Sequence, residues 1–264
     1  MYSFAYHKPS SLDEAARLFT GASDPRYLAG GHTLLPSMRL RLAGPSDLVD
    51  LGGIAELKGI KAEGGGVRIG AGTCHNAVAG SKEVKSAIPA LAQLAGGIGD
   101  FQVRNRGTIG GSIANNDPGA DYPAAVLGLG ATVHTNKRDI AADDYFKGLF
   151  ETALADGEIV TAVSFPKPKR AGYAKFPNPA SRYAIVGVFV AETDGGVRVA
   201  VTGAGPCVFR QAEMEKALGG SFSADALAGI AVAEDDLNSD IHAGADYRAH
   251  LVTVMAKRAV AAAS

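Results

Sequence analysis

Short blocks of apolar and polar residues along the first part of the chain predict a small β-α-β-α-β unit. FAYHKPSS (4–11) is typical of a strand entering a turn, and Ser11 and Glu14 form the capping-box pattern that begins a helix ended by Gly21. We expect further strands at RYLAG (26–30) and DLVDLGG (47–53). A helix that begins at Pro36 should connect them, because proline suits a first helical turn.

The middle of the chain mixes glycine-rich strand patterns with apolar helices. GGGVRIGAGTCHNAV (64–78) has the alternating character of a β region, and residues 81–99 have the spacing of one helix. YPAAVLGLGATVHTN (122–136) predicts a helical turn followed by a strand. Loops are expected over 141–157, before the strand EIVTAVSFP (158–166). PKPKRAG (166–172) is the best candidate for a domain boundary.

Beyond this boundary the pattern predicts strands and then helices. YAIVGVFVAE (183–192) and VRVAVTGAG (197–205) are strands joined by the turn sequence TDGG. Helical periodicity follows in residues 210–218, 223–234 and 246–263. The fold class is therefore α+β: domain one over 1–166, with subdomains 1–57 and 58–166, and a smaller α/β C-terminal domain over 170–264.

Composition narrows the class of protein. The chain has 264 residues, of which 47% are hydrophobic and 20% charged, an ordinary globular balance. With 26 basic and 27 acidic side chains the net charge is −1, so no nucleic-acid partner is expected. We also expect no membrane span, and the start of the chain lacks an export signal, which favours the cytoplasm.

Metal chemistry within the chain is not expected. Cys74 and Cys207 are too few for an iron–sulfur cluster, and the 6 histidines show no metal-binding spacing. Glycine is abundant at 34 residues, without low-complexity repeats. Such a composition predicts many turns and close backbone approaches.

Two glycine pairs are the strongest candidates for a binding site. AGGHTLLP (29–36) and TIGGSIANNDPGADYP (108–123) each follow a β pattern, and Thr33, Thr108 and Ser112 add hydroxyl groups. Bare backbone of this kind can present consecutive N–H groups to an anion such as a diphosphate. Neither segment fits a P-loop or a Rossmann fingerprint. The alternative is that both glycine pairs are simple tight turns.

The same segments resemble the two FAD-binding motifs of a flavoprotein family. AGGHTLLPSMRLRL (29–42) and TIGGSIANNDPGADYPAAVLGLGA (108–131) are similar to those of the FAD-carrying medium subunit of xanthine dehydrogenase-like molybdenum hydroxylases, and most of all to carbon monoxide dehydrogenase medium subunits. The resemblance extends over nearly the whole chain, through KFPNPASRYAIVGV (175–188) and DYRAHLVTVMAKRA (246–259). It implies a two-part PCMH-type FAD-binding domain followed by the smaller C-terminal domain.

The resemblance also implies the cofactor-binding residues, which come from both domains. The two glycine segments would enclose the FAD diphosphate, Asp121 would bind the ribose or ribityl region, and Tyr183 would lie against the isoalloxazine. The full set is Leu28, Ala29, Gly30, Gly31, His32, Thr33, Leu34, Leu35, Ile98, Thr108, Ile109, Gly110, Gly111, Ser112, Asp121, Val160, Lys175 and Tyr183.

Simpler roles stay open for several of these residues. Asp121 could cap the helix that follows it. Lys175 could be an ordinary surface lysine, and Tyr183 could pack on its own domain. His32 could contact a phosphate or cap a helix. Many relatives have Gly-Asp before the tyrosine, where this chain has Ser-Arg.

As a function, the resemblance implies electron transfer. Electrons from a molybdenum cofactor in a large subunit would pass through [2Fe–2S] clusters in a small subunit to FAD here, and then to an external acceptor. The expected assembly is a heterotrimer, commonly doubled as (αβγ)2. No residue of this chain is an obvious acid, base or nucleophile, and the sequence does not identify the substrate. The rivals are a self-contained flavin reductase or oxidase of the same fold, and a flavin-free scaffold subunit.

Overall fold

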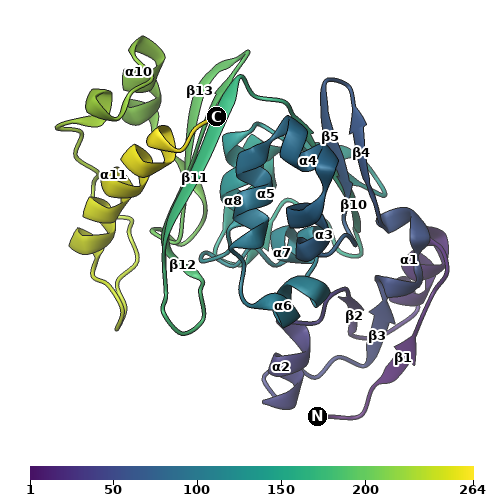
Figure 1. The fold of residues 1–264 in the computed structure, drawn as a ribbon. Coiled ribbons are helices and arrows are strands. Elements are labelled where there is room, and N and C mark those ends of the chain that lie inside the picture. Colours follow the sequence, from purple (N-terminus) through teal and green to yellow (C-terminus); the bar gives the residue numbers. More distant parts are fainter.

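Three sheets in succession along the chain form the frame of the protein (Figure 1). A computed structural model describes residues 1–264. A three-stranded and a five-stranded sheet belong to the first part, and a four-stranded sheet belongs to the C-terminal part. None of the helices is both long enough and apolar enough to cross a membrane.

The N-terminal unit has the predicted β-α-β-α-β order. Its strands run parallel in the order β1-β3-β2, so each helix is a crossover between parallel strands. The elements are β1 (Ala5–His7), α1 (Leu12–Thr20), β2 (Pro25–Leu28), α2 (Leu34–Arg39) and β3 (Asp47–Asp50), followed by the short 3₁₀ turns Leu51–Gly53 and Ala55–Leu57.

The start of α1 is fixed by side-chain caps. The Ser11 hydroxyl accepts a hydrogen bond from the Glu14 amide at 3.2 Å, as the capping-box pattern predicts. The returning bond differs: the Glu14 carboxylate accepts from the Ser10 amide at 2.8 Å. Helix α2 begins at Leu34, two residues before the predicted start at Pro36, so proline lies inside the first turn.

The second part surrounds an antiparallel sheet with the order β4-β5-β10-β6-β7. Helices pack beside this sheet in Figure 1. The strands are β4 (Ile60–Glu63), β5 (Gly66–Gly70), β6 (Thr132–Thr135), β7 (Asp139–Ala141) and β10 (Val160–Pro166), with a separate hairpin of β8 (Phe146–Gly148) and β9 (Glu151–Thr152). The helices are α3 (His75–Gly80), α4 (Lys82–Ala87), α5 (Pro89–Gly96), α6 (Phe101–Arg106), α7 (Ile109–Asn115), α8 (Tyr122–Gly128) and α9 (Ala142–Tyr145).

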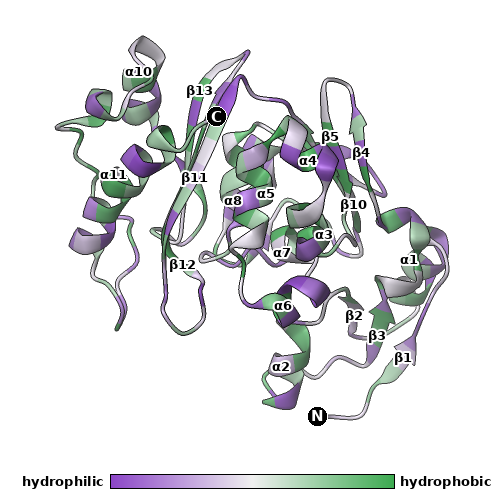
Figure 2. Ribbon diagram, in the orientation of Figure 1, coloured by the Kyte–Doolittle hydropathy of each residue, from purple (hydrophilic) through white to green (hydrophobic).

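The C-terminal part is an antiparallel sheet in the order β11-β12-β13-β14, with helices on one face. The predicted hairpin is present, and Gly196 takes a positive φ of 112° in its turn. The long helix α11 alternates between hydrophilic and hydrophobic residues in Figure 2 and packs on β11 and β12. The elements are β11 (Arg170–Pro177), β12 (Ala184–Thr193), β13 (Gly196–Thr202), β14 (Phe209–Arg210), α10 (Ala212–Gly220) and α11 (Ala245–Ala261).

Several element predictions were wrong for local reasons. The helix expected over 81–99 is broken at Ile88, because the following Pro89 pushes it out of the helical region. The helix expected over 223–234 shrinks to Ala224–Leu227, and Gly229 turns the chain with a φ of 79°. The loops expected over 141–157 contain α9 and the β8–β9 hairpin.

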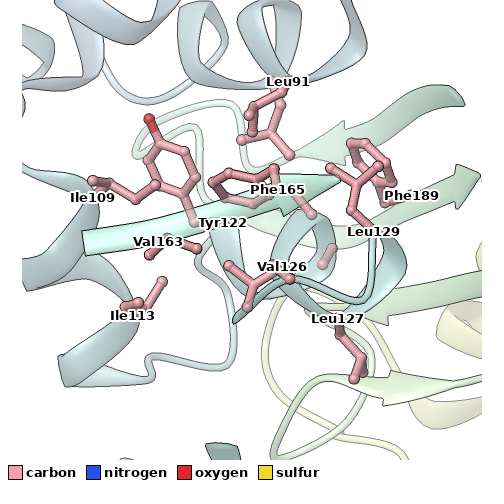
Figure 3. Packing of buried hydrophobic residues seen from close by; sticks show 14 of the residues in the cluster. Leu91, Ile109, Ile113, Tyr122, Val126, Leu127, Leu129, Val163, Phe165 and Phe189 are labelled. Carbon is pink, nitrogen blue, oxygen red and sulfur yellow. The ribbon is translucent and has the colours of Figure 1, made fainter. Parts of the chain in front are cut away.

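The two domains share a core. The largest apolar cluster joins strands and helices of the first part to residues of the C-terminal sheet. Figure 3 shows Phe189 from β12 beside Leu129 and Phe165. The other face of the C-terminal sheet has its own core against α10 and α11. The C-terminal sheet is therefore buried on both faces, and β12 is apolar from Ala184 to Ala191.

Candidate functional site

A cleft of about 880 Å³ lies where the N-terminal unit, the five-stranded sheet part and the C-terminal domain meet. This volume is within the roughly 300–1,000 Å³ usual for small-molecule sites. Residues that follow β1, β2 and β3 line it, at Lys8, Ala29–Leu34 and Asp50–Gly52. The cleft thus lies outside the carboxyl ends of the parallel strands, where ligands bind in open sheets.

The first glycine segment presents unused backbone amides to the cleft. None of the N–H groups from Ala29 to Leu34 donates to an acceptor in the chain. Gly31 has a φ of 79°, a conformation that suits glycine. Such a run of free amides is the arrangement that binds an anion. The backbone of this segment leaves its amides free for an anion, and anion binding here stays a prediction.

Gly30 lets the two glycine segments approach each other. A Cβ atom at this position would meet the backbone at the end of α6, namely the Arg106 carbonyl and the Gly107 Cα at 2.8 Å. Backbone cannot give way as a flexible side chain can. The absence of a side chain at Gly30 therefore holds the first segment against the turn that leads into the second.

The second glycine segment differs from the prediction, because it is the start of helix α7 and not a second nest. Its amides are bonded inside the chain: Gly110 N–H donates to the Ala71 carbonyl at 2.8 Å, and Gly111 N–H to the Thr108 hydroxyl at 3.1 Å. A Cβ at Gly110 would lie 2.5 Å from the Ala71 Cβ. These glycines therefore serve close packing, while the Thr108 amide has no acceptor in the chain.

Asp121 is buried at the edge of the cleft, and two residues of β11 hold its carboxylate. It stands at the N-cap position of α8 but makes no capping hydrogen bond, so that simpler role is wrong. The Tyr173 hydroxyl donates to one carboxylate oxygen, and the Lys175 ammonium lies 2.9 Å from the same oxygen. Burial raises the pKa of the Asp121 carboxyl, and the Lys175 charge and the Tyr173 bond oppose part of that rise.

Lys175 is not a surface lysine. Its side chain is only 11% exposed, and besides Asp121 its ammonium donates to the carbonyls of Gly97 and Arg182, each at 2.9 Å. It therefore ties together the turn before α6, the start of α8 and the loop before β12. It does not line the cleft itself.

Tyr183 lies at the mouth of the cleft, where it is 46% exposed. The preceding residue, Arg182, has a φ of 64° and donates a hydrogen bond to the Gly99 carbonyl at 3.2 Å. Ile98 lines the same region. Arg182 thus bonds the loop to the first domain, while the Ser181 hydroxyl accepts from the Tyr183 amide and Tyr183 lines the cleft.

Most of the predicted cofactor residues line this one cleft. The lining members are Leu28, Ala29, Gly30, Gly31, His32, Thr33, Leu34, Ile98, Thr108, Gly110, Gly111, Ser112, Asp121, Val160 and Tyr183. Leu35, Ile109 and Lys175 are behind it: the Leu35 side chain lies close to Gly31, and Ile109 is fully buried.

The two histidines and two arginines near the first glycine segment differ in their burial and their contacts. Arg104 donates to the carbonyls of Ile98 and Gly99, each at 3.0 Å, whereas Arg106 lines the cleft. His32 is exposed in the cleft. His75 is buried, and burial together with the charges of His32 and Arg104 lowers its pKa to about 4, so it is neutral at pH 7.

Sequence reasoning missed several residues of the site. Lys8, Asp50 and Lys58 line the cleft, as do Asp117 and Glu158. The rule that ligands bind at the carboxyl ends of parallel strands would have found Lys8 and Asp50 from the predicted strands alone. Asp117 and Glu158 reach the cleft through the tertiary fold, so no local signal marks them.

The buried Glu158 carboxylate pairs with the half-exposed Arg138 beside the cleft. Its carboxylate accepts hydrogen bonds from Arg138 at 3.1 Å, the Ala155 amide at 2.8 Å and the Thr135 hydroxyl at 2.7 Å. Burial alone would raise the pKa of Glu158, but these bonds outweigh it and lower the pKa to about 2. The folded protein is therefore stabilised by the ionised form.

We expect Glu158→Gln to lower the free energy of unfolding by about 1–3 kcal/mol at pH 7. Because the folded-state pKa is lowered, this stabilisation exists above the ordinary Glu pKa near ~4.3 and fades as pH falls towards 2. Urea unfolding at pH 7 and pH 3 measures it, with the exposed Glu56→Gln as control. An equal loss at both pH values would contradict the assignment.

Two known protein families together match nearly the whole chain. Residues 2–168 match the FAD binding domain in molybdopterin dehydrogenase, and residues 171–263 match the CO dehydrogenase flavoprotein C-terminal domain. The chain is 37% identical to the carbon monoxide dehydrogenase medium chain of Hydrogenophaga pseudoflava, over 98% of this chain and 96% of that one. It is 34% identical to the nicotine 6-hydroxylase medium subunit of Paenarthrobacter nicotinovorans, over 97% and 95%.

Solved structures agree with these matches. Reconstituted CO dehydrogenase from Oligotropha carboxidovorans superposes with a TM-score of 0.88 at 36% identity, covering 98% of this chain and 97% of that one. The fold and cleft therefore define a FAD-binding oxidoreductase subunit. The chain belongs to the FAD-carrying medium subunits of the xanthine dehydrogenase and carbon monoxide dehydrogenase family of molybdenum hydroxylases. Its relatives include proteins named as medium chains or medium subunits and one named as a subunit of a dehydrogenase complex.

Proposed function

We propose that this chain transfers electrons from [2Fe–2S] clusters of a partner subunit, through FAD bound in the cleft, to an external acceptor. In this role it would resemble the carbon monoxide dehydrogenase medium chains, to which it is 37% and 38% identical. We further propose that it assembles with a molybdenum-binding large subunit and a [2Fe–2S] small subunit, doubled as (αβγ)2. Bound FAD supplies the redox chemistry, because it accepts and releases electrons.

The observation that carries the cofactor assignment is the run of free amides at Ala29–Leu34. A diphosphate requires several donors, and these amides supply them without a lysine. A side chain at Gly30 would fill the contact between the two glycine segments. The residues present therefore fit FAD, with Thr33, Thr108 and Ser112 adding hydroxyl donors at the diphosphate.

We assign the rest of the cofactor by its chemistry. Ile98 and Tyr183 would bind the isoalloxazine, because an apolar side chain and an aromatic ring suit its planar surface. Asp121 would accept hydrogen bonds from the ribose or ribityl hydroxyls. Val160 would contact the cofactor from β10. Lys175 would act on the cofactor through Asp121 and the Arg182 turn, because it does not line the cleft.

The self-contained flavin reductase is the competing function. It needs a proton donor at the cleft, and two of the four carboxylates that line the cleft, Asp121 and Glu158, are engaged by cations and hydrogen bonds. This engagement favours a subunit that holds and positions the flavin. The run of free amides at Ala29–Leu34 favours an anionic cofactor over the flavin-free scaffold.

The proposal is tested by expressing the chain alone and with a candidate cluster subunit. We expect bound FAD in the visible spectrum and no substrate turnover by the chain alone. Addition of the reduced cluster subunit should bleach the flavin absorbance within a catalytic turnover time. Substrate turnover by the chain without any partner would contradict the proposal and favour the self-contained enzyme.

A further inference from the structure

We infer that Tyr173 is a positioning residue, through which the C-terminal domain fixes Asp121 for its contact with FAD. The inference rests on the proposed function, since it requires Asp121 to face the cofactor. Tyr173 is not among the cleft-lining residues and would not touch FAD. It lies on β11, on the other side of the boundary between the two domains from Asp121.

The geometry around Tyr173 is built for this bond. Tyr173 is 6% exposed, and its hydroxyl donates to the Asp121 carboxylate. Gly187, on the neighbouring strand β12, leaves the space for that hydroxyl, because a Cβ there would lie 2.5 Å from the Tyr173 oxygen. Phe189 packs against the tyrosine ring with the ring centroids 6.1 Å apart.

The tyrosine and Lys175 act from one face of the same strand. Residues 173 and 175 are two apart on β11, so their side chains point to the same side. Both bond Asp121, and the lysine also holds the carbonyls of Gly97 and Arg182. Lysine therefore supplies charge and joins three loops, while tyrosine supplies a directed donor that fixes the carboxylate orientation.

The tyrosine stays a donor over the working pH range. Burial, followed by the charge of Asp121 and the bond to it, raises the pKa of Tyr173 well above its ordinary value. Its hydroxyl therefore keeps its proton, and the carboxylate beside it acts as the acceptor. One carboxylate oxygen accepts from Tyr173 and lies 2.9 Å from the Lys175 ammonium, and the other accepts from Lys175 at 3.1 Å, so these two β11 residues fix the orientation of the carboxylate.

The test compares full-length chains carrying Tyr173→Phe, Asp121→Asn and both changes, by fluorescence titration with FAD. Tyr173→Phe should raise the FAD dissociation constant by about 5- to 50-fold, as expected for a lost bond to a charged group. In the Asp121→Asn background, Tyr173→Phe should add less than ~2-fold, because the two residues act as a unit. The visible circular dichroism of bound FAD should change in each single variant.

Controls separate this role from a loss of folding. Tyr145→Phe removes a buried hydroxyl that has no partner, so it should leave FAD binding unchanged. If Tyr173→Phe does not fold, Gly187→Ala provides the second variant, because its methyl group displaces the Tyr173 hydroxyl without deleting it. It should reproduce the weakened FAD binding.

The FAD titrations distinguish failure of the Tyr173 inference from failure of the proposed function. Wild-type affinity and spectrum in Tyr173→Phe overturn the inference and leave the proposed function intact. Additive losses in the double variant also overturn it, because the tyrosine would then act independently of Asp121. Unchanged FAD binding by Asp121→Asn contradicts the proposed role of that carboxylate. A wild-type chain that does not bind FAD overturns the proposed function itself.

Discussion

Replacing Gly30 by alanine is expected to weaken FAD binding by roughly 10- to 100-fold. The new methyl group would meet the Arg106 carbonyl at the end of α6 and the Gly107 Cα at 2.8 Å, and push the two glycine segments apart. Overpacking against backbone costs about 1–3 kcal/mol, and the first glycine segment with its free amides is displaced from the second. Fluorescence titration of the flavin-free chain with FAD measures the change.

Gly80→Ala is the matched control for this experiment. Gly80 is the last residue of α3, and nothing lies within 4 Å of a Cβ at that position. Its affinity for FAD should equal that of the wild type. Tight FAD binding by Gly30→Ala would show that the contact between the two segments is not needed for the cofactor.

Replacing Lys175 by methionine is expected to lower the free energy of unfolding by about 3–5 kcal/mol at pH 8. The change leaves Asp121 buried at 4% exposure without its cation. It also removes the donor shared by the Gly97 and Arg182 carbonyls, so the Tyr183 loop should loosen. Thermal and urea unfolding of the full chain measure the stability.

The pH dependence of this variant follows from Asp121. Burial raises the pKa of its carboxyl, and loss of Lys175 removes an opposing charge. When the folded state raises the pKa of an acid, the protein loses free energy of unfolding as pH rises. The loss runs from the ordinary pKa of the acid, near ~4, to the raised value. Lys175→Met should therefore be more stable at pH 5 than at pH 8.

Two further variants check this explanation. The Lys169 side chain is 58% exposed, and its ammonium lies 3.9 Å from the carboxylate of the fully exposed Asp194. Lys169→Met should therefore lower the free energy of unfolding by less than ~1 kcal/mol. The double variant Lys175→Met with Asp121→Asn removes the buried charge and should recover part of the lost stability. A double variant as unstable as the sum of both single changes would contradict the coupling.

Much of the fold follows from patterns in the sequence. The N-terminal β-α-β-α-β unit was predictable because its apolar blocks are separated by clear caps, such as Ser11, and by turn residues. The β12–β13 hairpin was predictable from TDGG between two apolar runs. Helix α11 has 17 residues and a long periodic pattern, which is the most reliable kind of signal.

Short elements were harder, because tertiary contacts decide them. Ile109–Asn115 contains two glycines, which are poor helix formers, yet it forms α7 since the Thr108 hydroxyl caps it and Gly110 packs on Ala71. The predicted second nest failed for the same reason: local sequence does not show which amides find acceptors elsewhere in the chain. The amides around Gly30 are free and the Gly110 amide is bonded to Ala71, and only the tertiary structure shows this difference.

The sequence predicted most of the residues of the site but not how they contact one another in space. The glycine segments, Asp121 and Tyr183 were found from motifs, and they line one cleft. The role of Lys175 required knowledge that its ammonium reaches Gly97, 78 residues earlier in the chain. Tyr173 carries no motif, and it is notable only because its hydroxyl meets a buried carboxylate from the other domain.

Amide hydrogen exchange with and without FAD tests the central claim most directly. The claim is that the free amides of Ala29–Leu34 hold the cofactor diphosphate. We predict that FAD slows exchange in peptides covering residues 27–36, while the amides of Gly110 and Gly111, already bonded in the chain, change much less. FAD binding that leaves exchange over residues 27–36 unchanged would contradict the account.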